Sequence, residues 1–435
     1  MIKSAGGIYM GYNFFGDIQI SNAIGRKLGE FRASLGEAVS RGKNITFADR
    51  DIAYSMKLQR DRIARKGLEL DYDVYLRDEN NNQFHPASSW KDAHYESTVC
   101  FNPCGRKRIV KKNGKVCYKD DRKSILYETV TDVITGTHPD NDPISCPNCG
   151  AVSTVAGLQN GCAYCGTRFQ MDELFPKVTS YYFIDDVAIN KSEFKTGYIK
   201  AYFVAMIATY ILMCILKGEV YLPWNLLMHP SKLISTSIGI VLGSIPIAYV
   251  LYAYFLFMRL IFRGASSSSK MGTIGSRKKF EARMKTISPE FSFEYFTSRA
   301  QSLIKTAVLS DDERQLTFYE GTALDPKMKD IIDMNYGGAL GCLSFREDGN
   351  YVTVVTKAYF DVLYATDSKV YYKPEAFTAT FRRRTDIPVN FNFSMSRIAC
   401  PSCGASFDAT KIKNCPYCGN KYEITSDDWA LVELK

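Results

Sequence analysis

Two long apolar stretches dominate the pattern of hydrophobic and polar positions in this chain. The first runs from Ala201 to Leu216 (16 residues) and the second from Leu233 to Met258 (26 residues), and neither contains a charged residue. At about 1.5 Å of rise per residue, the first approaches and the second exceeds the roughly 30 Å hydrocarbon core of a bilayer. The pattern therefore predicts a transmembrane helical hairpin over residues 199–262, rather than two buried helices of a large globular core.

Lysine and arginine residues flank this hairpin asymmetrically. Three lysines precede the first stretch within ten residues, and eight lysines and arginines follow the second, from Arg259 to Lys285. The charged residues of the loop between the stretches are Lys217, Glu219 and Lys232. Because basic flanks favour the cytoplasmic side, we expect an integral protein of the plasma membrane with two spans and both termini in the cytoplasm.

Small residues recur at four-residue spacing in both apolar stretches. The first stretch has them at Ala201, Ala205 and Thr209, and the second has them at Ser235, Gly239 and Gly243. Such spacing lets helix backbones approach closely. Two interpretations stay open: the two spans pack on each other, or Gly239 and Gly243 join two copies of the chain.

The chain before the hairpin divides into three parts. Residues 1–68 are basic. Up to residue 45 they are glycine-rich, and we expect irregular or weakly helical structure there. From Phe47 to Lys66 the pattern predicts a helix. Residues 69–140 alternate between polar and apolar positions, which predicts a small β-rich unit. A cysteine-rich segment follows over residues 141–182.

The chain after the hairpin has the pattern of a linker and an α+β domain. Residues 263–287 are basic and rich in serine and glycine, which predicts a flexible linker near the inner leaflet. Residues 288–435 begin with an amphipathic helix and later alternate with period two. We expect short helices around Asp312–Tyr319 and Pro326–Met334, then strands over Gly341–Glu347, Tyr351–Ala365, Val370–Arg384 and Asn390–Arg397, and a closing strand from Trp429. Helices followed by a curved antiparallel sheet make an α+β domain.

The cysteines add a prediction of metal binding. The 435 residues carry a formal net charge of +9 and 13 cysteines, eight of which form four Cys-x-x-Cys pairs. Two such pairs about 12 residues apart are typical of a zinc ribbon, in which four thiolates close the coordination sphere of a structural ion. We expect two zinc ribbons, the second inserted over residues 398–423, and two structural zinc ions. The expected ligands are Cys146, Cys149, Cys162 and Cys165, then Cys400, Cys403, Cys415 and Cys418.

A third group of residues carries a weaker metal signal. His94, Cys100, Cys104 and Cys117 are spaced H-x5-C-x3-C-x12-C in the β-rich unit. Four such side chains could hold a zinc ion, but their spacing matches no standard metal-binding knuckle. Buried free cysteines are the alternative interpretation.

The C-terminal stretch resembles a known family. The features that carry the resemblance are the Pro289-Glu290-Phe291 opening, the amphipathic helix after it, and the late CPSCG…CPYCG insertion before a strand that contains Trp429. Over residues 288–435 they are similar to the domain of the mitochondrial inner-membrane translocase subunit 44 family and its bacterial relatives, which include membrane proteins with zinc ribbons. The resemblance implies a cone-shaped fold like that of nuclear transport factor 2, with helices packed on a strongly curved antiparallel sheet.

Three functions are compatible with these features. The first is a non-enzymatic membrane scaffold or adaptor that presents the ribbons and the cone-shaped domain to a cytoplasmic protein partner or to anionic lipid. The second is nucleic-acid binding through the ribbons and the basic segments, although the ribbon loops lack basic, aromatic-rich sequences. The third is an enzyme in the pocket of the cone. Its acid–base candidates would be Asp333, Tyr336, Tyr359 and Asp361, since all four histidines (His85, His94, His138 and His229) precede this domain.

Overall fold

A computed structural model gives the fold of the chain. It describes residues 22–435 except 78–84, 92–94, 134–140, 142, 147–148, 159–161, 166–175, 186–190, 218–229, 290, 388–397, 405, 408–411 and 427. The contacts divide these residues into two compact units. A hairpin unit lies within residues 187–271, and a head unit combines residues 10–186 with residues 272–435.

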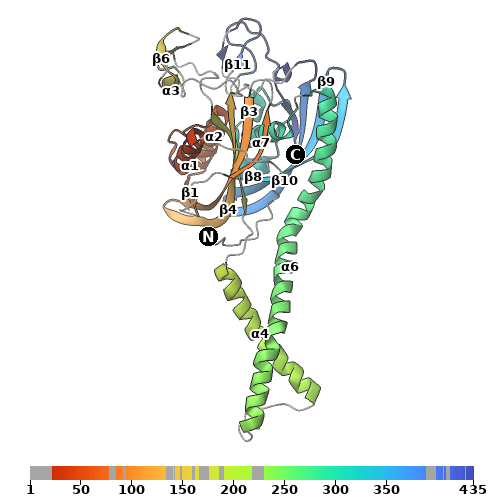
Figure 1. Cartoon of the computed structure of the whole chain (residues 1–435). Helices are drawn as coiled ribbons and strands as arrows, with labels where there is room; N and C mark the ends of the chain where they lie inside the picture. The colour runs from red at the N-terminus through yellow and green to blue at the C-terminus, as the bar shows by residue number, and fades with distance from the viewer. Residues whose placement is uncertain are drawn as a thin grey trace. The chain divides into compact units, whose positions relative to one another are not determined.

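The hairpin unit consists of α4 (Lys191–Lys217) and the first part of α6 (Pro230–Ile287), drawn in Figure 1. Its segments Lys195–Ile215 and Ser237–Phe255 are long and apolar enough to cross a membrane. Small residues make the contact between the helices: Ala205, Ser244 and Ala248 are fully buried, while most of the large apolar side chains around them are exposed. The predicted hairpin of apolar helices is therefore present, and its outer surface is apolar.

Polar groups also join the two helices of the hairpin unit. The Tyr202 hydroxyl donates a hydrogen bond of 3.0 Å to the carbonyl oxygen of Val241. A Cβ atom at Gly243 would lie 3.6 Å from the Thr209 methyl group, whereas a Cβ atom at Gly239 would meet nothing within 4 Å. Of these two glycines, Gly243 therefore faces the partner helix and Gly239 does not.

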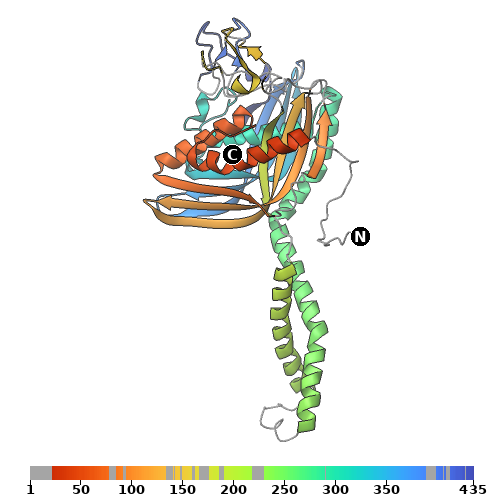
Figure 2. The same cartoon turned by 60° about the vertical axis from the view of Figure 1, so that its left-hand side comes forward.

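The first half of the head unit is an antiparallel sheet covered by two helices. The strands are β1 (Leu68–Leu76), β2 (His85–Lys91), β3 (Tyr95–Lys112), β4 (Lys115–Val133) and β7 (Lys177–Asp185), in the order β1-β3-β4-β7 with β2 also on β3. The helices α1 (Asn22–Arg41) and α2 (Arg50–Arg65) cover one face of this sheet (Figure 2). Phe31 and Leu35 of α1 are fully buried in the core between them.

The second half of the head unit has one helix and a four-stranded antiparallel sheet. It contains α7 (Phe293–Leu309), β8 (Ile331–Asp348), β9 (Tyr351–Ala365), β10 (Val370–Arg384) and β13 (Ala430–Leu434), with strand order β8-β9-β10-β13. α7 begins at Ser292, whose side chain accepts a hydrogen bond from the Tyr295 N–H. Phe296 of α7 and Trp429 pack together in its core, with ring centroids 4.8 Å apart.

The two halves repeat one topology. In each half a helix comes first, antiparallel strands follow, and a cysteine-rich insertion precedes a final strand that pairs with the last strand before the insertion; the first half differs in having a second helix, α2, and an additional strand, β2. In both halves the insertion contains a two-stranded sheet, β5 (Pro143–Ser145) with β6 (Val152–Thr154) and β11 (Ile398–Ala399) with β12 (Ser406–Phe407). A short helix, α3 (Val155–Leu158), follows β6. The membrane-length hairpin is therefore inserted between two similar halves.

Side chains from both halves hold the head unit together. Asn335 of β8 accepts a hydrogen bond of 2.8 Å from the Phe183 N–H of β7 and donates one of 2.7 Å to the Phe183 carbonyl oxygen. Arg62 of α2 donates to three backbone carbonyl oxygens of the second half, at 2.8–3.2 Å. Arg108 of β3 forms a buried ion pair of 2.7 Å with Asp333 of β8.

The predicted elements differ from the structure in four places. Residues 22–41 of the glycine-rich start form a helix, and α6 continues as a helix to Ile287 through the expected flexible linker. The two expected short helices are 3-10 turns, Glu313–Gln315 and Pro326–Asp330, and β8 begins already at Ile331. The expected strand over 390–397 lies outside the described residues.

Candidate metal centres and polar cavity

Four cysteine sulfurs meet in the first insertion. The Sγ atoms of Cys146 and Cys165 are 3.7 Å apart, as are those of Cys149 and Cys162. All four Sγ atoms lie within 4.8 Å of one another. We call this group the first cysteine cluster.

The second insertion brings its four cysteines together in the same way. The Sγ atoms of Cys400 and Cys418 are 3.6 Å apart, and so are those of Cys403 and Cys415. In each cluster the first and third cysteines are buried and the second and fourth are exposed. We call this group the second cysteine cluster, and its repeated burial pattern supports a common local fold.

Backbone turns shape these cysteine pairs. Gly150, Gly404 and Gly419 each follow a pair and have positive φ angles of 72°, 72° and 75°. At each of these glycines the N–H donates to the carbonyl oxygen of the first cysteine of the pair, at 2.8–2.9 Å. Only glycine adopts this left-handed conformation without strain, so the spacing Cys-x-x-Cys-Gly closes a tight turn around the sulfurs.

The same turns favour the thiolate form of the Cys400 side chain. Burial opposes ionisation, but backbone N–H groups of Cys403 and Ser402 donate to the sulfur and lower the thiol pKa to about 6. The thiolate is the form of cysteine that binds metal ions.

The geometry of both clusters fits a tetrahedral metal ion. For a zinc–sulfur distance of about 2.3 Å, a regular tetrahedron places its sulfurs about 3.8 Å apart. The pairs above lie at 3.6–3.7 Å. The chain could therefore bind two metal ions, and the thiolate-only donor set is consistent with zinc.

The two clusters differ in what surrounds them. Cys146 and Cys162 pack with Leu158 in a small core of their own. Cys400 and Cys415 instead belong to the main core of the second half of the head unit. The second cluster is thus part of that core, and the first has a separate one.

The same position is exposed in both clusters. Tyr164 lies between Cys162 and Cys165 and is 78% exposed, and Tyr417 lies between Cys415 and Cys418 and is 73% exposed. These two tyrosines are not among the site residues expected from the sequence, although both clusters share the Cys-x-Tyr-Cys spacing.

The third expected metal site does not assemble among the described residues. Cys100 and Cys104 are buried on β3, and burial raises the pKa of both thiols to about 12. Cys104 pairs with Ser124 of β4, whereas Cys117 lies seven residues away along β4 and donates to the Val110 carbonyl oxygen. Since a strand rises about 3.3 Å per residue, Cys117 is too distant to share an ion with Cys104. His94 lies outside the described residues.

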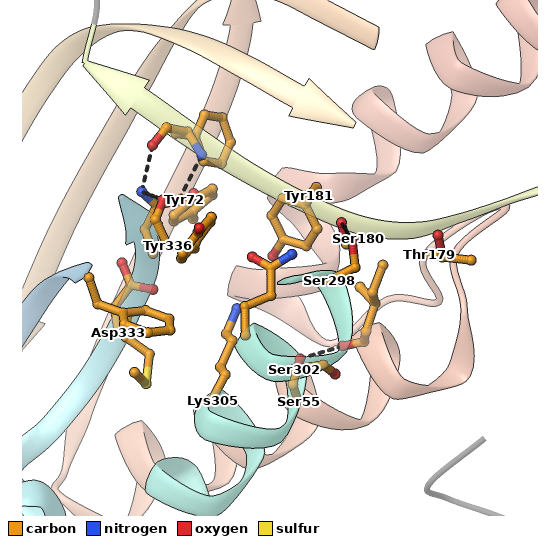
Figure 3. A pocket seen from close by; sticks show the side chains of 16 residues that line it. Ser55, Tyr72, Thr179, Ser180, Tyr181, Ser298, Ser302, Lys305, Asp333 and Tyr336 are labelled. Atoms are coloured by element: carbon orange, nitrogen blue, oxygen red, sulfur yellow. Dashed lines mark hydrogen bonds between the residues drawn. The ribbon is translucent and has the colours of Figure 1, made fainter. Parts of the chain in front are cut away.

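The structure also separates the four acid–base candidates. Asp333 and Tyr336 line a cavity in the head unit (Figure 3). Tyr359 and Asp361 are half-buried and lie on the face of β9 opposite to its buried residues. Both carboxylate oxygens of Asp333 accept hydrogen bonds, from Gln59 at 2.9 Å and from Arg108 at 2.7 Å. The Asp333 carboxylate is therefore engaged by structural partners.

Sequence patterns missed the residue that projects into this cavity from α7. Lys305 belongs to the second half of the head unit, and Tyr181, whose ring faces its amine, belongs to β7 of the first half. No local pattern could have joined them, because they meet only when the two halves pack together.

The chain was compared with protein-family models, curated proteins and solved structures, and no match was found in any of the three comparisons.

Proposed function

We propose that this chain is a non-enzymatic membrane adaptor that carries two zinc ribbons and presents them to a cytoplasmic protein partner. In this proposal, α4 and α6 form a two-span anchor in the plasma membrane, with both termini in the cytoplasm. The observation that carries it is the combination of two closed four-cysteine clusters with a hairpin of exposed apolar helices.

The connectivity of the head unit supports a two-span anchor. Residues 10–186 and 272–435 form one compact unit, and the hairpin lies between them in the chain. Both ends of the hairpin must then be on the same side of a membrane, so both helices cross it or neither does. Exposed apolar surface on both helices favours crossing.

The donor sets support a structural role for zinc. Four thiolates complete the tetrahedral coordination sphere of the ion and leave no position for a substrate or a reactive water. Thiolate sites in chain segments before and after the hairpin also favour a reducing compartment, which agrees with the cytoplasmic side expected from the basic flanks.

The exposed tyrosines support a protein partner. Tyrosine is enriched in the energetically important positions of protein interfaces, because its ring covers apolar surface and its hydroxyl can form a hydrogen bond. Tyr164 and Tyr417 occupy equivalent, solvent-exposed positions of the two clusters. The exposed Lys278 and Lys279 of α6 suit contact with anionic lipid. For residues 288–435 we further propose the cone-shaped fold of the translocase subunit 44 family. The support is the order of the elements, in which one helix is followed by an antiparallel sheet of long strands.

A topology and metal assay tests this proposal. Zinc per purified chain is measured in detergent, and a single cysteine reporter at Glu219, in the loop of the hairpin, is labelled from outside intact cells in a background free of other accessible cysteines. We expect two zinc ions per chain and labelling from outside. A loop that is labelled only after the membrane is opened would contradict the topology, and a chain without bound zinc would contradict the ribbons.

A second experiment tests the partner surface. A photo-crosslinking amino acid at Tyr164 or Tyr417 is compared with one at Lys327, an exposed residue of a 3-10 turn outside both clusters. The adaptor proposal expects one protein cross-linked from both tyrosine positions and not from Lys327. Cross-links to RNA or DNA, lost at high salt, would instead favour nucleic-acid binding.

A further inference from the structure

A small polar cavity lies at the junction of the two halves of the head unit. It has a volume of about 50 Å³ and is walled by α2, β1 and β7 of the first half and by α7, β8 and β9 of the second. Since a bound water needs roughly 10–15 Å³, this space holds a few waters or one small ligand group.

Three hydrogen-bond donors line this cavity without using their donor groups. They are the Lys305 amine, the Gln301 amide and the Tyr181 hydroxyl, for which no hydrogen bond is found among the described residues. Lys305 and Gln301 lie four residues apart on α7 and so share one face of the helix. Figure 3 shows Lys305 and Tyr181 pointing toward one another, and the amine lies 5.4 Å from the centre of the Tyr181 ring.

The charge on Lys305 has no ion-pair partner among the described residues. Asp333 is the acidic residue whose charge acts on it, but Arg108 already pairs with Asp333 at 2.7 Å and with Asp120 at 2.6 Å. Burial lowers the pKa of Lys305, and Asp333 opposes that effect. The Asp333 carboxylate is therefore shared, and the Lys305 amine has no carboxylate in ion-pair contact among the described residues.

A second buried cation lies next to the cavity wall. Arg106 is 1% exposed and pairs with no carboxylate in the described structure, although the Tyr72 hydroxyl lies beside its guanidinium group as a hydrogen-bonding neighbour. It lies over the ring of Phe183, 5.0 Å from the ring centre, and its charge acts on Tyr72 and Tyr181; these three aromatic residues line the cavity. Arg106 therefore adds a buried positive charge beside the cavity, and a buried charge without a counter-ion is costly.

We propose that the cavity binds a small monocarboxylate through Lys305, Gln301 and Tyr181. One carboxylate supplies a counter-charge for the Lys305 amine and has enough lone pairs to accept from all three donors. A monocarboxylate suits the site better than a phosphate because one amine is available at the wall and the space is small.

A neighbouring hollow gives the ligand room for an apolar substituent. It has a volume of about 180 Å³ and shares Ser298, Gln301 and Tyr336 with the first cavity. Trp90, Tyr182 and Phe293 contribute aromatic surface to its walls. Short aliphatic and aromatic monocarboxylates should therefore bind better than acetate.

Binding to the full chain in detergent tests this proposal, which does not depend on the adaptor role. Acetate, butyrate, benzoate and inorganic phosphate are titrated at constant ionic strength, and binding is followed by calorimetry and by the rise in melting temperature. Lys305→Met is compared with Lys327→Met, which removes an exposed lysine. We expect saturable binding of butyrate or benzoate that Lys305→Met weakens roughly 10- to 100-fold and Lys327→Met leaves unchanged.

The same variants separate a ligand site from a structural lysine. Without ligand, Lys305→Met should melt no lower than the parent, because it replaces an unpaired charge by an apolar side chain of similar length. No saturable binding of any carboxylate, equal binding by both lysine variants, tighter binding of phosphate, or a Lys305→Met chain that melts lower in the absence of ligand would each overturn the proposal.

Discussion

Asn335 offers the sharpest test of how the two sheets of the head unit are joined. It is 8% exposed and forms three hydrogen bonds: it accepts from the Phe183 N–H at 2.8 Å and donates to the carbonyl oxygens of Phe183 at 2.7 Å and Tyr336 at 3.1 Å. We expect Asn335→Ala to remove all three and to leave the N–H and C=O groups of Phe183 without partners at the edge of β7.

The size of the effect follows from these contacts. At about 1 kcal/mol net per hydrogen bond, the loss is about 3 kcal/mol, and the buried groups left unpaired raise it toward about 5 kcal/mol. For a unit of this size, a loss of about 3 kcal/mol corresponds to a melting temperature lower by roughly 5–10 °C. Asn335→Asp should cost at least as much, because a carboxylate cannot donate to the two carbonyl oxygens and would face them as a like charge.

Thermal unfolding in detergent measures this effect. Tryptophan fluorescence follows the unfolding, and Trp429, which is 1% exposed in the second half of the head unit, contributes the signal from that core. Asn350→Ala is the matched control, because Asn350 is exposed and makes a single long side-chain hydrogen bond of 3.3 Å to Asp386. The control should stay within about 0.5 kcal/mol of the parent. Equal shifts for Asn335→Ala and Asn350→Ala would refute the view that this amide joins the sheets.

Three further predictions concern metal, pH and the hairpin. We expect Cys415→Ala and Cys162→Ala each to lose one of two bound metal ions, as measured by elemental analysis. Only Cys415→Ala should clearly lower the melting temperature of the head unit, because Cys415 belongs to the main core of its second half. Equal shifts of the melting temperature would contradict this. Although burial opposes it, hydrogen bonds and charge from Arg108 hold the pKa of Asp120 below its usual value of 3.8, so its stabilising effect is present above about pH 3.8 and is lost as the pH falls. Asp120→Asn should therefore flatten the decline of melting temperature between about pH 5 and pH 3, and an unchanged slope would count against the ion pair. Gly243→Leu should separate the hairpin helices while Gly239→Leu leaves them packed, as read from disulfide cross-linking of engineered cysteine pairs, because only Gly243 faces Thr209.

Local patterns predicted the elements whose formation is local. The period-two sequence pattern from Tyr351 to Ala365 and from Val370 to Arg384 predicted both strands with the bounds that the structure has. The cysteine spacing likewise predicted which four cysteines form each cluster, because the geometry of a Cys-x-x-Cys-Gly turn is set by these few residues themselves.

Elements that depend on distant contacts were not predictable in this way. Glycines made α1 look irregular, yet Gly36 is required there: a Cβ atom would lie 2.8 Å from the Tyr72 carbonyl oxygen of β1, so the helix packs directly on the strand. The serine-rich continuation of α6 looked like a linker, but Phe280 and Met284, one turn apart, are buried in the core of the second half. The sequence also gave no sign that the two halves form one unit, because Arg108 and Asp333 are 225 residues apart.

That separation has a consequence during synthesis. At about 5–20 residues per second, roughly 10–45 s pass between the emergence of Arg108 and that of Asp333 from the ribosome. The hairpin is synthesised within this interval, while Gln59, Arg62 and Arg108 still lack their partners. A chain that inserted only one helix would leave its halves on opposite sides of the membrane, where they could never meet. In the proposed two-span arrangement, closure of the head around Arg108 and Asp333 would therefore require that both helices had crossed the membrane.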